Sequence, residues 1–173
     1  MQRKEGGTLI LKGFKQRKIE KIFEDMILTE KDKLYKLAYM YVKNSNDAQD
    51  ILQESIMKAY KNLHTVKDMK LLDRWLKRII INSAIDYIKK KSKLLLIDEL
   101  QGIEARHYDR EFEDLYEAVD TLEPELKSII VLKYFQGYTI DEVGEILEIA
   151  PSRVKNRLHK ALKLLRMEIS MTS

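Results

Sequence analysis

Apolar residues recur along the chain at intervals of three and four, the spacing that places them on one face of an α-helix. In the first half, this pattern covers stretches that begin near Ile19 and Leu34, and then residues 47–63 and 70–91. Together the stretches predict one compact helical domain over residues 20–92. Residues 1–19 are basic, contain three glycines and show weak periodicity, so we expect a mobile or weakly ordered arm there.

The helical spacing returns in the last third of the chain and predicts a second small domain over residues 113–171. Residues 93–112, in between, change from a short apolar patch to acidic and mixed charge, and we interpret them as a partly helical linker. With only 6 Gly and 2 Pro in 173 residues, the chain has few of the turn-forming residues that a β fold with many turns requires. The predicted fold class is therefore all-α, with two small helical domains joined by a flexible linker.

The second domain contains two short helical patterns separated by a tight break, within residues 138–166. Thr139 followed by Glu142 fits a capping box at the start of the first helix, and Pro151 fits the first turn of the second. Gly144 is small where the two helices would cross. This organisation predicts a helix-turn-helix, in which one helix enters the major groove and its neighbour braces it.

Two positions fit this motif less well. Glu148 lies where the turn often has glycine, and Ala150 lies where a capping Ser or Thr is expected. An ordinary amphipathic hairpin with a solvated basic face has the same spacing, so it stays open as an alternative.

The second helix of the motif, at 153–166, carries six Lys and Arg residues and no acidic residue. Such side chains neutralise phosphates and release counterions, so binding would weaken steeply with salt. Lys155, Asn156 and Lys160 could reach base edges. Since the whole chain has a net charge of only +4, these cations form a local patch, and the pattern favours duplex DNA as the ligand.

The stretch from 47 to 57 has an anionic face. Asp47, Asp50, Gln53 and Glu54, called here the acidic face, lie three or four residues apart and share one side of a helix. A solvated surface, a docking surface for a basic protein and a two-metal carboxylate site all fit this pattern. The chain has no Cys, three scattered His and no second acidic helix beside this one, so we predict no metal and no cofactor.

Polar residues in the pattern at 70–91 recur every four positions beside Trp75. This basic stripe consists of Arg74, Arg78, Asn82, Asp86 and Lys90, and it ends in the lysine run at 89–93. Cations interleaved with an aromatic and an amide suit a strand whose bases are partly unstacked. A core position for Trp75 and a solvated helix end for the lysines are the alternatives.

Four motifs in sequence resemble those of the extracytoplasmic-function sigma factors of bacteria, within the sigma-70 superfamily. They are Asp47-Ala-x-Asp-x-x-Gln-Glu, Arg74-Trp-Leu-x-x-Ile79, Asn82-x-Ala-Ile-Asp86-Tyr and Val154-Lys-x-Arg-Leu-His-x-Ala161. The resemblance covers about residues 20–170 in the right order and spacing. Each motif is moderately specific alone, and the series is highly specific.

The resemblance implies an RNA polymerase sigma factor that binds the core enzyme and directs promoter recognition and transcription initiation in a cell-envelope stress response. Core binding would use the clamp coiled coil of the β′ subunit, against Asp47, Asp50, Gln53 and Glu54, and also the β subunit. The minus-10 promoter element would bind Arg74, Trp75, Arg78, Asn82, Asp86, Lys89 and Lys90. The minus-35 element would bind Ser152, Arg153, Lys155, Asn156, Arg157, His159 and Lys160.

Further expectations rest on the same resemblance. The loop at 64–69 would help to hold a base flipped out of the minus-10 element, where pocket contacts offset the cost of unstacking. The acidic linker would run through the RNA-exit path of the polymerase. An anti-sigma factor, which we expect to be membrane-anchored, would sequester both domains.

The chain would perform no catalysis of its own, because the polymerase carries out nucleotidyl transfer. A helix-turn-helix regulator that acts without polymerase is the alternative function, although the sequence shows no dimerisation heptad. No apolar stretch approaches the roughly 20 residues that span a bilayer. We therefore expect a cytoplasmic protein without direct membrane insertion.

Overall fold

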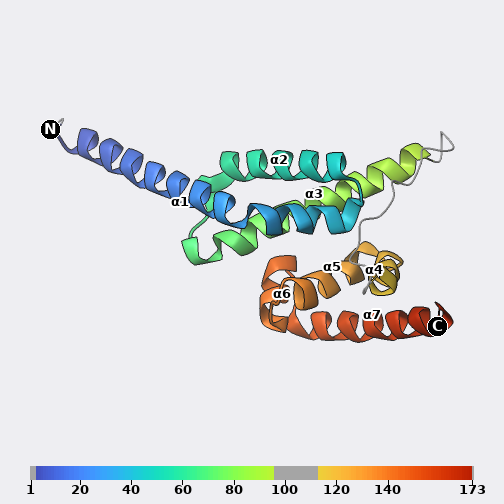
Figure 1. Cartoon of the computed structure of the whole chain (residues 1–173). Helices are drawn as coiled ribbons and strands as arrows, with labels where there is room; N and C mark the ends of the chain where they lie inside the picture. Colours follow the sequence, from blue (N-terminus) through green and yellow to red (C-terminus); the bar gives the residue numbers. More distant parts are fainter. Residues whose placement is uncertain (1–2, 96–112, 173) are drawn as a thin grey trace.

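A computed structural model of the chain describes residues 3–95 and 113–172, with side chains from 13 to 93 and from 115 to 170. The helices are α1 (Arg3–Val42), α2 (Ser45–Asn62), α3 (Leu72–Leu95), α4 (Glu113–Asp120), α5 (Pro124–Ile130), α6 (Ile140–Leu147) and α7 (Pro151–Thr172). Short turns η1 (Leu63–Thr65) and η2 (Met69–Leu71) follow α2, and a π-helical turn, η4 (Val131–Phe135), follows α5. In Figure 1, α1–α3 form one layer and α4–α7 pack beneath it. The all-α prediction is confirmed for the described residues.

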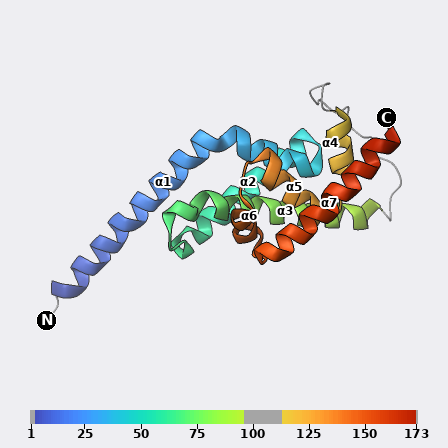
Figure 2. The ribbon, with the colours of Figure 1, turned by 90° about the horizontal axis from the view of Figure 1, so that it is seen from below.

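Helix α1 is a single element from Arg3 to Val42. This differs from the weakly ordered arm expected at residues 1–19 and merges the two patterns that begin near Ile19 and Leu34. No proline interrupts the stretch, and each residue added to an existing helix gains a backbone hydrogen bond, so scattered glycines do not end it. Figures 1 and 2 show the N-terminal half of α1 projecting beyond the other helices.

The first three helices pack against one another through their apolar faces. Leu34 and Leu37 of α1, Ile51 of α2, and Leu76 and Ile80 of α3 are almost completely buried. Full burial of such a side chain stabilises the fold by about 1.5–3 kcal/mol. The three-and-four spacing that predicted these helices therefore marks the faces that pack together.

The second half forms the predicted helix-turn-helix from α6 and α7. The capping box is present, because the Thr139 side chain accepts from the backbone N–H of Glu142 and the Glu142 carboxylate accepts from the backbone N–H of Thr139. Glu148 ends α6 in the left-handed conformation, with φ 53°. Pro151 opens α7, as expected.

The two halves contact each other in what we call the closed arrangement, with α3 packed against α6. Ile146 of α6 belongs to the same apolar cluster as Leu76 of α3. The Tyr41 hydroxyl of α1 donates to the Ser128 Oγ of α5 at 2.8 Å in a buried position, and burial raises the pKa of Tyr41. Of the linker expected at 93–112, the first three residues belong to α3 and residues 96–112 lie outside the described part.

We expect Gly144→Ala to lower the free energy of unfolding by about 1–2 kcal/mol, because overpacking costs ~1–3 kcal/mol and the better helix propensity of Ala offsets part of it. The new Cβ would lie 2.8 Å from the backbone oxygen of Ile149, which cannot rotate away. Urea titration followed by circular dichroism measures the change.

Gly13→Ala is the matched control, because a Cβ at that helical position meets nothing within 4 Å. It should leave the free energy of unfolding unchanged or raise it by up to about 1 kcal/mol. An equal loss in both variants would show that Gly144 does not mark a close helix crossing.

Candidate nucleic-acid and docking surfaces

Most of the acidic face is accessible on α2. The side chains of Asp50, Gln53 and Glu54 are exposed. Glu54 also pairs with Lys58 one turn later, at 2.7 Å, and this hydrogen bond with its charge lowers the pKa of Glu54. Glu54 therefore favours its ionised form, and the side chains of Asp50, Gln53 and Glu54 are open to a partner.

Asp47, the first member of the acidic face, lies in a different environment. Its backbone N–H donates to the Asn44 side chain, which caps α2, at 2.9 Å. Its carboxylate pairs with Lys91 near the end of α3, at 3.0 Å. Asp47 thus braces α2 against α3, and the more accessible members of the acidic face are the three that follow it.

The C-terminal part of the basic stripe is solvent-accessible. Asn82, Asp86, Lys89 and Lys90 are all exposed along α3. These residues project from one helix and leave room for an extended ligand to lie along it.

The N-terminal part of the stripe is engaged by α6. The Arg74 guanidinium donates to the carboxylates of Glu142 and Glu145, and the Arg78 guanidinium donates to both carboxylate oxygens of Glu148. A planar guanidinium presents a fork of N–H groups that matches a carboxylate or a phosphate equally well. The glutamates therefore occupy the guanidinium groups that could otherwise hold another oxyanion, such as a phosphate.

Glu142 serves both the helix cap and this interdomain contact. Hydrogen bonds from the backbone N–H and the hydroxyl of Thr139 lower its pKa, and the charge of Arg74 acts in the same direction. Because the anionic form is favoured, Glu142 remains a partner for Arg74 across the neutral pH range.

A buried hydrogen-bond network lies behind these ion pairs. Lys77 of α3 is only 4% exposed and donates to Asp73 at 2.9 Å and to the Tyr138 hydroxyl at 2.7 Å. The same hydroxyl donates to Asp73 at 2.5 Å. Burial, then the hydrogen bond with the Asp73 carboxylate, raises the pKa of Tyr138, so this hydroxyl keeps its proton. The network joins α3 to the residue that leads into α6.

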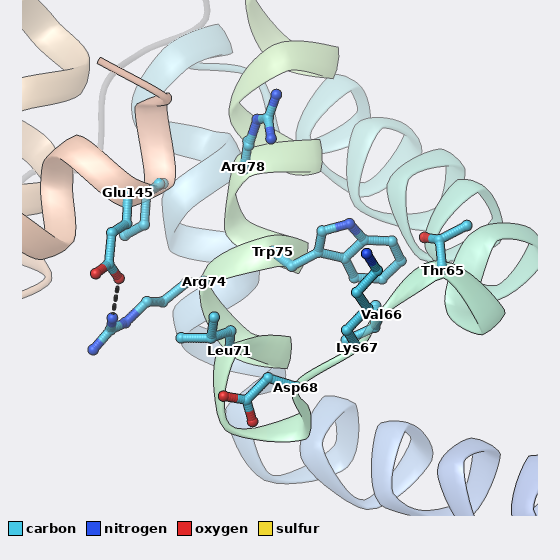
Figure 3. A pocket seen from close by; sticks show the side chains of 10 residues that line it. Thr65, Val66, Lys67, Asp68, Leu71, Arg74, Trp75, Arg78 and Glu145 are labelled. Carbon is cyan, nitrogen blue, oxygen red and sulfur yellow. Dashed lines mark hydrogen bonds and ion pairs between the residues drawn. The ribbon is translucent and has the colours of Figure 1, made fainter. Parts of the chain in front are cut away.

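A cavity of about 290 Å³ lies between the loop after α2, the start of α3 and α6. In Figure 3, the Trp75 indole lies beside Val66 and Lys67 of the loop, and Arg74 reaches across to Glu145. Trp75 is half-buried: its ring packs against the core and also lines the cavity. An aromatic face beside cations suits a stacked, unpaired base.

The basic face of α7 is open to solvent along the outside of its domain (Figure 2). Its exposed predicted residues are Ser152, Arg153, Lys155, Asn156, His159 and Lys160. Arg157 differs, because it is half-buried and pairs with Glu125 of α5 at 2.7 Å. The structure therefore brings most of the predicted duplex-reading residues onto one accessible surface and uses Arg157 to hold α7 to α5.

Two further observations concern other kinds of site. Within the described ranges, no three His, Asp or Glu side chains gather in a way that could hold a metal ion. In the same part of the chain, no helix is both long and apolar enough to cross a membrane.

Sequence reasoning missed the partners of the basic stripe. Glu142, Glu145 and Glu148 recur every three residues in the motif, which is a visible signal of an anionic helix face. Arg74 and Arg78 likewise lie about one turn apart on their own helix, but a sequence does not state which helices pack together.

Two family descriptions match the chain. Sigma-70 region 2 matches residues 26–94, and Sigma-70, region 4 matches residues 112–165. The first contains α2 and the loop and α3 residues that line the cavity beside Trp75, and the second contains the helix-turn-helix, whose helix α6 closes that cavity. The two surfaces described above thus fall within two separately matched regions.

Similar proteins include the RNA polymerase sigma factor SigV of Bacillus subtilis, which is 37% identical over 150 residues, with 83% of this chain and 89% of the relative covered. The ECF RNA polymerase sigma factor SigW of the same organism is 31% identical, covering 85% and 88%. A solved structure of the sigma factor RpoE in complex with the anti-sigma factor NepR, from Bartonella quintana, has a TM-score of 0.73 at 19% identity, covering 86% and 96%. CnrH, solved with the cytosolic domain of CnrY, has a TM-score of 0.65 at 18% identity, covering 87% and 89%. These structures share the fold of this chain.

Reversing one glutamate on α6 should open the closed arrangement. We expect Glu145→Lys to raise the open population by about 1.4- to 5-fold or more, because an exposed ion pair contributes about 0.2–1 kcal/mol and the new charge also repels Arg74. The chain contains no Cys, so dyes placed at Gln49→Cys and Lys163→Cys report the separation of the two halves by energy transfer.

Asp141→Lys is the matched control for this measurement. Asp141 is an exposed carboxylate on the same helix, and it takes no part in the described ion pairs with α3. Unchanged transfer in Glu145→Lys, or an equal fall in the control, would contradict the role assigned to the ion pairs. About 1 M salt, where the Debye length is ~3 Å, should also lower the transfer in the wild-type chain.

Proposed function

Because the chain belongs to the extracytoplasmic-function group of the sigma-70 family, we propose that it divides the work of an RNA polymerase sigma factor among three surfaces. The acidic face docks on the core enzyme, the basic stripe with the cavity beside Trp75 engages the minus-10 element, and α7 reads the minus-35 element. The observation that carries this division is that exposed carboxylates of α2 and exposed cations of α3 and α7 lie on separate elements.

The acidic face supplies the contact with the polymerase. Asp50, Gln53 and Glu54 meet the clamp coiled coil of the β′ subunit, and Asp47 fixes the angle at which α2 presents them. Charge complementarity of this kind steers association and sets its orientation. The β subunit contacts the second domain.

The minus-10 element binds along α3 as a partly opened strand. Phosphates of the strand bind the guanidinium groups of Arg74 and Arg78. Toward the end of the helix, the strand contacts Asn82, Asp86, Lys89 and Lys90. A flipped base enters the cavity between the loop and Trp75, where stacking and pocket contacts offset the cost of leaving the duplex.

The minus-35 element remains double-stranded and receives α7 in its major groove. Lys155, Asn156 and Lys160 face the base edges, while Ser152, Arg153 and His159 reach the backbone around them. Arg157 contributes through its contact with α5, which fixes the helix that enters the groove.

The closed arrangement keeps the N-terminal part of the minus-10 surface covered in the free protein. Arg74 and Arg78 are held by α6 glutamates, so promoter DNA gains its arginine contacts only after α3 and α6 separate. We expect docking on core polymerase to separate them. The free protein would therefore bind promoter duplexes weakly, in contrast to an independent helix-turn-helix regulator.

Regulation and location complete the proposal. Of the solved structures that share the fold, one contains the sigma factor RpoE with the anti-sigma factor NepR, and another contains CnrH with the cytosolic domain of CnrY. They support an anti-sigma partner for this chain, which we expect to be membrane-anchored. The chain acts in the cytoplasm, in a cell-envelope stress response. It performs no catalysis, because nucleotidyl transfer belongs to the polymerase.

Charge reversal on α2 tests docking. We expect Asp50→Lys combined with Glu54→Lys to lower co-purification with core RNA polymerase at least about tenfold, because like charges across an interface cost several kcal/mol and ~1.4 kcal/mol is already tenfold. Circular dichroism should show an unchanged helical fold. The matched control is Glu24→Lys with Asp32→Lys, two exposed carboxylates of α1. Co-purification at the wild-type level would favour the regulator that works without polymerase.

Alanine substitution on α7 tests minus-35 reading. We expect Lys155→Ala and Lys160→Ala each to reduce transcription about tenfold or more at promoters with an intact minus-35 element, since a good base contact contributes about 1–3 kcal/mol. Transcription in vitro on a promoter library with core polymerase measures this and reveals the preferred sequence. Lys163→Ala with Arg166→Ala removes charge from the same helix and serves as the control. Open-complex yields unchanged by the first two substitutions would show that α7 does not read this element.

A further inference from the structure

The N-terminal part of α1 carries a basic surface that none of the three proposed surfaces uses. Lys15, Lys18, Ile19 and Ile22 are separated by three and four residues, so they share one face of the helix. All four precede residue 26, where the match to sigma-70 region 2 begins. This surface therefore lies outside the matched region.

This face of α1 and the loop after α2 together line an open cavity of about 660 Å³. The loop contributes His64, Val66, Lys67 and Met69 to the lining. Ile19, Val66 and Met69 are half-buried, whereas the Lys and His side chains are exposed around them. The cavity thus has an apolar floor and a cationic rim, and no carboxylate is among its lining residues.

Acidic and basic side chains of this part of α1 lie on different sides of the helix. Glu20 and Glu24 lie near Tyr60 of α2, where the charge of Glu20 and, to a smaller degree, that of Glu24 raise the pKa of the Tyr60 hydroxyl. Gln16 donates to Glu20 on that side of the helix at 3.1 Å. The carboxylates Glu20 and Glu24 therefore lie toward α2, whereas Lys15 and Lys18 line the cavity beside the loop and give it a positive rim.

The basic cavity continues from the cavity beside Trp75. Val66 and Lys67 line both of them, and η1, at the start of the loop, packs against α1 (Figure 1). A strand with one base held beside Trp75 must leave that cavity along its sugar–phosphate backbone. A path over Lys67 leads directly to Lys15 and Lys18.

We propose that this α1 cavity binds the sugar–phosphate backbone of the single DNA strand that continues from the base held beside Trp75. Lys15, Lys18 and Lys67 contact its phosphates, and the apolar floor accepts the sugar edges. The site rests on the proposed function and adds a third DNA contact to it. An anionic membrane could also attract a basic helix face, but a membrane does not account for the two residues shared with the Trp75 cavity.

Holoenzyme assembled from core polymerase and this chain tests the site on forked promoter probes. One probe ends its single strand at the flipped base, and two others extend that strand by a few nucleotides toward the 5′ or the 3′ end. One extension should tighten binding of wild-type holoenzyme, and Lys15→Ala with Lys18→Ala should remove this gain. For two lost single-strand phosphate contacts, the log–log salt dependence on the extended probe should become shallower by about 1.4.

Lys31→Ala with Lys36→Ala is the matched control, because it removes two exposed lysines from α1 away from the cavity. Equal behaviour of the two double variants on all probes would overturn the proposal. If Lys15→Ala with Lys18→Ala no longer sediments with phosphatidylglycerol vesicles but binds all probes as the wild type does, the proposal is overturned in favour of a membrane surface. If wild-type holoenzyme starts no transcription at any promoter, the proposed function itself is wrong. If it transcribes normally but neither extension tightens its binding, only the proposal for the α1 cavity is wrong.

Discussion

The guanidinium groups of Arg74 and Arg78 can hold α6 glutamates or another oxyanion such as a phosphate, but not both, and the proposed function depends on this choice. In the closed arrangement the glutamates hold them. Both arginines are partly accessible, so water and salt screen the contacts and the pairing is readily reversed. A stronger anion, or a partner that pulls the halves apart, can therefore replace these ion pairs, while the apolar contact of Ile146 with the α1–α3 helices also joins the two halves.

Two charged groups at the interface are compatible with such separation, because Lys77 and Asp120 each have a partner within their own half. Lys77 keeps Asp73, one turn earlier on α3, when Tyr138 leaves. Asp120 pairs with Lys43 across the interface at 3.1 Å and with Lys127 of its own half at 2.8 Å. Breaking a buried pair is costly when it leaves one charge alone. Opening does not do so for Lys77 or Asp120, but it exposes the apolar contact at which Ile146 of α6 joins the α1–α3 cluster.

The sequence could predict those features that depend on residues close together in the chain. The capping box at Thr139, the first turn at Pro151 and the close crossing at Gly144 depend on residues within about two turns, so their patterns were readable and are confirmed. The pairing of Arg74 with Glu145 joins residues 71 positions apart, and charged residues at helical spacing look the same whether they face water or a partner. The extension of α1 through residues 3–19 was not predicted for a related reason: weak periodicity suggested weak order, although helix continuation needs only one backbone hydrogen bond per residue.

Glu148 shows how the local and the distant requirements meet in one residue. The turn between α6 and α7 needs a left-handed backbone, and Glu148 adopts it with φ 53°; for a residue with a side chain this costs roughly 1–2 kcal/mol. Glycine would satisfy the turn without that cost, which is why glutamate fits the motif poorly in sequence. Glycine, however, has no carboxylate, and Glu148 uses both of its oxygens to hold Arg78 of α3. The strained turn thus lies where the helix-turn-helix covers the basic stripe, so the residue that departs from the motif is also the residue that links the two DNA-binding halves.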